Sequence, residues 1–142
     1  MAMAETVNFS QLREFALREL GAAAYPHDTH YFRLYDCNLC GVVPLALNIE
    51  HHTGSKKASF KGVISGECTI CGVNKQVFKF TGNQRTPQKV QKPKCSCGND
   101  RFYVANCERY EGEQGMPGFF DEGVIVGQCA ECGKLRAFVY TD

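Results

Sequence analysis

The sequence predicts a small, metal-stabilised, mainly β protein in which two tandem three-stranded antiparallel sheets follow one N-terminal α-helix. Three observations predict it: nine cysteines among 142 residues, an internal repeat, and a single stretch with helical periodicity. With 44% hydrophobic and 22% charged residues, the composition is that of a globular chain. A chain of this length holds one ordinary domain or two very small ones, which excludes a large multi-domain enzyme.

The N-terminal segment, residues 1–31, is predicted as a helix followed by an extended arm. The helical stretch begins near Phe9 and places four apolar side chains on one face: Leu12, Phe15, Ala16 and Leu20. Asn8 or Ser10 is positioned to cap it, and Gly21 to end it. A helix this short needs a surface to pack against. We expect that surface to be the chain's own β structure, and a partner protein is the alternative.

The chain contains an internal duplication. Residues 62–72 read GVISGECTICG and residues 123–133 read GVIVGQCAECG, an offset of 61. Upstream, residues 47–54 (LNIEHHTG) align with residues 105–112 (ANCERYEG) at an offset of 58. Each copy ends in an alternating, aromatic-rich strand pattern, at residues 76–80 and 135–140. The sequence therefore predicts one β unit over residues 32–82 and a second over residues 95–142.

Between the copies, residues 83–94 (NQRTPQKVQKPK) contain two prolines and four basic residues. Proline and charge at this density are typical of a connecting segment. We interpret the segment as a basic, Pro-containing linker.

Short-spaced Cys pairs, each followed by Gly, occur twice in each copy. Such a turn points two thiolates at one ion, and the Gly permits the backbone conformation that follows the second ligand. Two facing turns complete a tetrahedron of sulfur atoms, as in structural Zn²⁺ sites. The sequence predicts two Zn²⁺ ions per chain, held by Cys37, Cys40, Cys68 and Cys71 and by Cys95, Cys97, Cys129 and Cys132. Rubredoxin-type iron and a disulfide framework are the alternatives.

The motifs CNLCG, CTICG and CAECG resemble those of the zinc-ribbon superfamily, and the resemblance covers residues 32–142. It implies Cys turns on β-hairpins joined in a three-stranded sheet. The motif CSCG, at Cys95 and Cys97, is one residue shorter than the family pattern. In size and ribbon content the chain is also similar to the small zinc-bearing γ-type subunits of acetone and acetophenone carboxylases. That likeness implies that an ATP-dependent carboxylation would belong to larger subunits.

The ninth cysteine and the histidines are not assigned to a metal. Cys107 aligns with Ile49 of the first copy, which favours a small buried residue over a nucleophile. The histidines are expected to be solvated or hydrogen-bonded, because eight thiols already fill two sites: His27, His30, His51 and His52.

No catalytic residues are predicted. Four thiolates saturate an ion and leave no position for water. The sequence has no phosphate-binding loop, nucleophile elbow or dinucleotide fingerprint. It also has no signal-like segment and no apolar run long enough to span a bilayer, so we expect a cytoplasmic protein.

Charge divides unevenly along a chain whose net charge is +1. Residues 1–36 sum to −2, residues 37–94 to +7 and residues 95–142 to −4. The sequence thus favours an interaction module that is a non-catalytic subunit of a larger, enzymatic complex. The alternative is a nucleic-acid-binding or transcription-linked protein acting through the basic first unit. Its candidate contacts are Lys56, Lys57, Lys61, Lys75, Lys79, Arg85, Lys89, Lys92 and Lys94.

Overall fold

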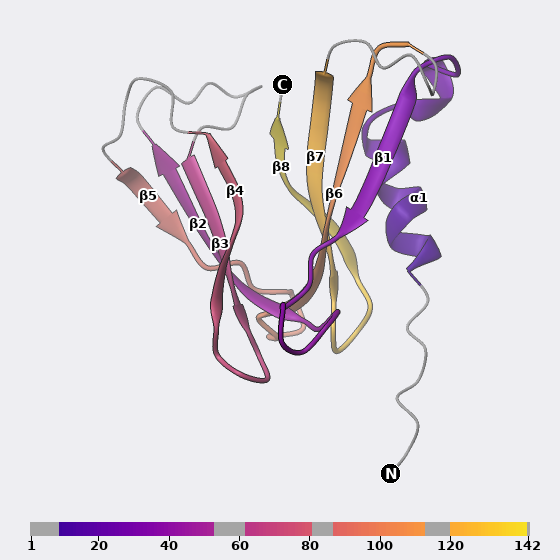
Figure 1. The fold of residues 1–142 in the computed structure, drawn as a ribbon. Helices are drawn as coiled ribbons and strands as arrows, with labels where there is room; N and C mark the ends of the chain where they lie inside the picture. Colours follow the sequence, from indigo (N-terminus) through magenta and orange to yellow (C-terminus); the bar gives the residue numbers. More distant parts are fainter. Residues whose placement is uncertain (1–8, 53–61, 81–86, 113–119, 142) are drawn as a thin grey trace.

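The computed structural model describes residues 9–52, 62–80, 87–112 and 120–141 and is mainly β (Figure 1). The described chain contains one α-helix, a 3₁₀ turn and eight strands. Their bounds are α1 Ser10–Glu19, η1 Ala22–Ala24, β1 Thr29–Leu34, β2 Leu45–His52, β3 Gly62–Cys68, β4 Asn74–Phe80, β5 Pro87–Gln91, β6 Arg101–Tyr110, β7 Phe120–Cys129 and β8 Leu135–Thr141. The mainly β prediction is confirmed, as is the single N-terminal helix.

The strands form one eight-stranded sheet rather than two separate three-stranded sheets. Strands β4, β3, β2 and β5 make a first half-sheet, and β8, β7, β6 and β1 make a second. The halves are joined where Leu45 and Ala46 pair with Phe102 and Arg101. They diverge from this junction in Figure 1.

Each half-sheet gains its fourth strand from the segment that leads into the other copy. β1 precedes the first Cys pair yet pairs with β6 of the second half-sheet. β5 precedes the third Cys pair and pairs with β2 of the first. The segment interpreted as a linker therefore contributes a strand as well as a connection. Pro87 is compatible with this role, because proline is tolerated at the first residue of an edge strand.

The strand register repeats in both halves. β3 and β4 shift register between Ile64 and Ser65, and β7 and β8 shift between Ile125 and Val126, an offset of 61 in each case. In β2, however, Ile49 lies opposite Ile64, whereas in β6 Asn106 lies opposite Ile125. Strands β2 and β6 therefore correspond at an offset of 57 residues and not 58. The reason is that the CSCG turn before β6 is one residue shorter than the CNLCG turn before β2.

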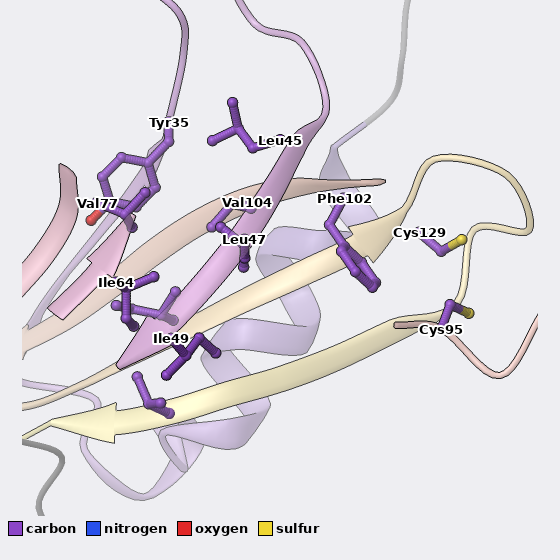
Figure 2. Packing of buried hydrophobic residues seen from close by; sticks show 12 residues of the cluster. Tyr35, Leu45, Leu47, Ile49, Ile64, Val77, Cys95, Phe102, Val104 and Cys129 are labelled. Atoms are coloured by element: carbon purple, nitrogen blue, oxygen red, sulfur yellow. The ribbon is translucent and has the colours of Figure 1, made fainter. Parts of the chain in front are cut away.

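The main hydrophobic core lies between the two half-sheets and uses both copies (Figure 2). Twelve buried side chains form it: Tyr35, Leu45, Leu47, Ile49, Ile64, Val77, Cys95, Phe102, Val104, Ile125, Cys129 and Val139. Alternate residues of each strand point to this face, as strand geometry requires. Because both copies supply it, neither half-sheet has a complete core alone.

The helix α1 packs on the outer face of the second half-sheet, as expected of a helix that docks on its own chain. Leu12 and Ala16 are fully buried there, against four strand residues: Ala105, Cys107, Val124 and Val126. The helix begins after Phe9 without a side-chain cap. The predicted Ser10 cap is wrong, since Ser10 lies within the helix, and Asn8 is outside the described residues. No helix in the described ranges could cross a membrane.

No helix of the described residues covers the first half-sheet, whose equivalent positions are polar. The cross-strand pair Ala105 and Val126 corresponds in register to Asn48 and Ser65 of the first half-sheet. Burying an amide and a hydroxyl without partners is unfavourable. The outer faces of the two copies have therefore diverged at this position, while buried apolar residues of both copies form the main core.

A buried arginine fixes the turn between the helix and β1. Arg109 of β6 has a side chain 4% exposed, and its Nη1 donates to Oδ2 of Asp28 at 2.7 Å. The guanidinium stacks on Tyr25 at 3.7 Å from the ring centroid, and Glu122 lies 3.5 Å from Nη2. The hydrogen bond from Arg109 outweighs the effect of burial and lowers the pKa of the Asp28 carboxyl below its usual 3.8.

Candidate metal centres

Eight of the nine cysteines form two groups, and they are the two groups that the spacing predicts. The groups are Cys37, Cys40, Cys68 and Cys71 in one, and Cys95, Cys97, Cys129 and Cys132 in the other. Within each group the Sγ atoms all lie within 4.8 Å of one another, and no disulfide forms.

The measured sulfur separations fit a tetrahedral metal site. Sγ of Cys37 lies 3.6 Å from that of Cys71, and Cys95 and Cys132 are 3.5 Å apart. A disulfide would place the sulfurs about 2 Å apart. Four sulfurs at the usual Zn–S distance from one ion stand about 3.8 Å apart. The two groups can therefore each hold a metal ion.

The turns that carry the thiols share one backbone design. Gly41, Gly72, Gly98 and Gly133 follow the Cys pairs and have φ of 85°, 80°, 96° and 80°. These values lie in the left-handed region that favours glycine. The N–H of Gly72 donates to the carbonyl of Cys68 at 2.9 Å, and Gly133 does the same to Cys129 at 3.0 Å. The predicted role of these glycines is confirmed.

Backbone donors polarise one thiol in the first group. The N–H groups of Cys71 and Ile70 point at Sγ of Cys68, at 3.5 and 3.4 Å. These donors outweigh burial and lower the pKa of Cys68 to about 6. Burial and neighbouring thiols raise the pKa of Cys40 to about 12. Deprotonating all four thiols therefore needs a bound cation to balance the charge.

The second group adds a side-chain donor. Burial acts to raise the pKa of Cys129, but the N–H of Cys132 and the Asn99 amide help to lower it to about 6. Nδ2 of Asn99 lies 3.3 Å from Sγ of Cys129. The shorter CSCG turn still closes, since the N–H of Cys95 donates to the carbonyl of Asn99 at 2.7 Å.

Cys107 stays apart from both groups. It is fully buried beneath α1, and burial raises the pKa of its thiol to about 11. Its register partner is Val124, so its counterpart is Glu50 rather than Ile49. The predicted burial is confirmed, although the alignment behind it was one residue out.

Histidine does not join the thiols among the described residues. Nε2 of His51 and Oε1 of Gln91 lie 2.8 Å apart, which ties β2 to β5. His27 and His30 line a separate open concavity of about 720 Å³ beside Asp28. His52 lies in β2, and its side chain is outside the described part of the chain.

The structure describes some of the basic residues that are candidate contacts to nucleic acid. Lys75 is engaged by Asp36, with Nζ 3.1 Å from Oδ1. Lys79, Lys92 and Lys94 are exposed. Lys89 belongs to β5, and its side chain is outside the described part of the chain. Four further positions lie outside the described residues altogether: Lys56, Lys57, Lys61 and Arg85.

Four exposed apolar residues lie within the two Cys turns of the first thiol group or within two residues of them. We call them the apolar patch: Leu39, Val42, Ile70 and Val73. Leu39 is 78% exposed and Ile70 68%. In the second copy, Glu131 stands in place of Ile70 and Lys134 in place of Val73. The sequence reasoning missed this contrast, although aligning the two repeats displays it.

Comparison with protein-family models, with curated proteins and with solved structures gives no match for this chain. The two thiol groups and the surfaces around them are therefore the features from which we infer a function.

Proposed function

We propose that the chain is a non-catalytic double zinc-ribbon interaction module, a small structural subunit of a larger enzyme complex. Each ribbon consists of three strands of one half-sheet, β2–β4 or β6–β8, with its two Cys turns. Four thiolates favour Zn²⁺ or iron over hard cations. Zinc has no redox chemistry in proteins and is typical of closed structural sites with four protein ligands. The activity of the complex, such as a carboxylation, belongs to the larger subunits.

The apolar patch carries the proposal that the module binds another protein. Leu39 and Ile70 are the outermost residues of turns that the metal holds rigid, so they lose little conformational entropy on binding. An exposed apolar patch is typical of a protein interaction site, and these four residues belong to or flank the two turns of one thiol group. The second copy has Glu131 and Lys134 at the positions of Ile70 and Val73, so a group of four thiols does not itself require apolar residues there.

The test is capture of partners from the native host by the tagged, zinc-loaded chain, with half of the lysate treated with nuclease. We expect stoichiometric large polypeptides that survive nuclease. Ile70→Glu, which installs the residue of the second copy, should abolish their capture and leave the zinc content unchanged. Val90→Glu is the matched control, because Val90 is 55% exposed on β5. Equal capture by wild type and both variants would refute the proposal.

A second candidate is nucleic-acid binding through the basic first half. The observation that favours it is a net charge of +7 over residues 37–94, with Lys79 and Lys92 exposed. Binding through phosphate contacts falls steeply with salt. Reversing Lys79 and Lys92 to Glu should then lower affinity and flatten the salt dependence. Lys75 is unsuitable for this test because it pairs with Asp36. Absence of binding at low salt would remove this candidate.

A further inference from the structure

A cationic concavity lies beside the second thiol group. It measures about 350 Å³ and is lined by Lys94, Cys95, Ser96, Lys134, Leu135 and Arg136. Nζ of Lys134 donates to Oγ of Ser96 at 3.0 Å, and Nη1 of Arg136 donates to the carbonyl of Lys94 at 3.3 Å. Arg136 also stacks over Phe138, 5.0 Å from the ring centroid. These contacts hold two of the three cations at the concavity.

The same place in the first copy is electrically balanced. Asp36 stands where the second copy has Lys94, immediately before the first Cys, and Lys75 stands where it has Arg136. Lys75 donates to the carbonyl of Asp36 at 2.7 Å, as Arg136 does to that of Lys94. The backbone contact thus supports the correspondence. Lys75 is neutralised by the Asp36 carboxylate, 3.1 Å away.

In the second copy a cation stands in place of that carboxylate. Lys94 replaces Asp36, and Lys134 replaces Val73. Among the described residues, no acidic side chain lines the concavity, and none forms an ion pair with any of its three cations. Like charges that share a concavity repel one another unless an anion binds between them.

The charge of a metal site does not explain these cations. Zinc with four thiolates carries a net charge of about −2 in either copy. The first copy has the same four ligands beside a neutral Asp36 and Lys75 pair. Among the described residues around the two thiol groups, only those of the second copy therefore include three unpaired cations.

We propose that this concavity binds the phosphate group of a small phosphomonoester. A guanidinium supplies a planar fork of N–H donors to phosphate oxygens, and two ammonium groups add point charges. Three cations suit a dianion better than a monocarboxylate. Lys134 and Arg136 belong to residues 95–142, which sum to −4, whereas Lys94 ends the basic segment of residues 37–94. This inference is independent of the proposed partner binding.

The test uses the zinc-loaded full chain and methyl phosphate as the probe, at constant ionic strength. Amide chemical shifts of Ser96 and Leu135 should move and saturate with a dissociation constant below ~10 mM. Lys94→Asp, which restores the residue of the first copy, should weaken binding by at least about tenfold. Lys92→Asp is the matched control, because it makes the same charge change at an exposed lysine outside the lining.

Further arms identify the ligand class. Acetate should bind more weakly than methyl phosphate, and Lys134→Val should weaken phosphate binding without loss of zinc, which keeps the test informative if Lys94→Asp misfolds. Tighter binding of a short oligothymidylate, lost in Lys94→Asp, would assign the site to a nucleic-acid backbone and overturn the monoester. Equal loss in Lys92→Asp, or no saturable phosphate binding, would overturn the site itself.

Discussion

Phe32 of β1 lies opposite Cys107 of β6 in the strand register. The strand that leads into the first Cys pair is thereby paired with the copy that contains the other four ligands. The reciprocal pairing joins Ile49 of β2 to Gln91 of β5. Each copy completes the sheet of the other, so the duplication has produced one interdependent structure.

Strand exchange predicts that the second copy cannot fold alone. A fragment of residues 83–142 lacks α1 and β1 and exposes the apolar face that includes Ala105 and Val126. We expect it to aggregate or to lack a cooperative unfolding transition even with excess zinc. Analytical ultracentrifugation and urea unfolding check this. A monomeric, cooperatively unfolding fragment would contradict the exchange.

The docking of α1 predicts a large effect of truncating Leu12, which is fully buried. Leu12→Ala should lower the free energy of unfolding by about 2–5 kcal/mol, because it removes apolar contact and leaves a cavity. Gln11→Ala, at the exposed neighbour, should change it by less than about 0.5 kcal/mol. Both are measured by urea unfolding at fixed free zinc. Equal effects of the two substitutions would mean that the helix does not pack there.

Cys107 is predicted to be inert in the folded protein. At pH 8 a thiol with a pKa of about 11 is almost wholly protonated, and this one has no access to reagent. Iodoacetamide should leave it unmodified in zinc-loaded protein and modify it after unfolding, as peptide mass spectrometry can show. Modification at the rate of a free thiol would place Cys107 at the surface.

The buried arginine predicts a pH-dependent contribution of Asp28. Because its pKa is lowered in the folded state, the stabilisation by the carboxylate is fully present above the unfolded pKa of 3.8. It is lost as the pH falls through the folded value. Asp28→Asn should therefore lower the urea midpoint by a constant amount from pH 8 to pH 5. A deficit that disappears by pH 6 would show that Arg109 relies on other partners.

Local features of the fold could be predicted from the sequence. The spacing of Cys68 and Cys71 and the following Gly72 determine one turn, and the duplication indicates which turns face each other. The apolar face around Leu12 likewise follows from helical periodicity. These features depend on residues close together in the chain, where short-range geometry decides the outcome.

Long-range choices could not be predicted in the same way. Alternation shows which residues share a face of a strand, but not which strand is its neighbour. Arg109 and Asp28 are 81 positions apart, and no local pattern links them. Pro87 made a strand look like a linker, because proline is rare in strands away from edges.

Metal content tests the central claim, that each copy holds one structural zinc ion, most directly. We predict two zinc ions per chain by elemental mass spectrometry after purification without added metal, and one in Cys68→Ser, with Cys107→Ser retaining two. Cys68→Ser should also destabilise both half-sheets, because they share one core. Iron in place of zinc, or an unchanged zinc content in Cys68→Ser, would contradict the account.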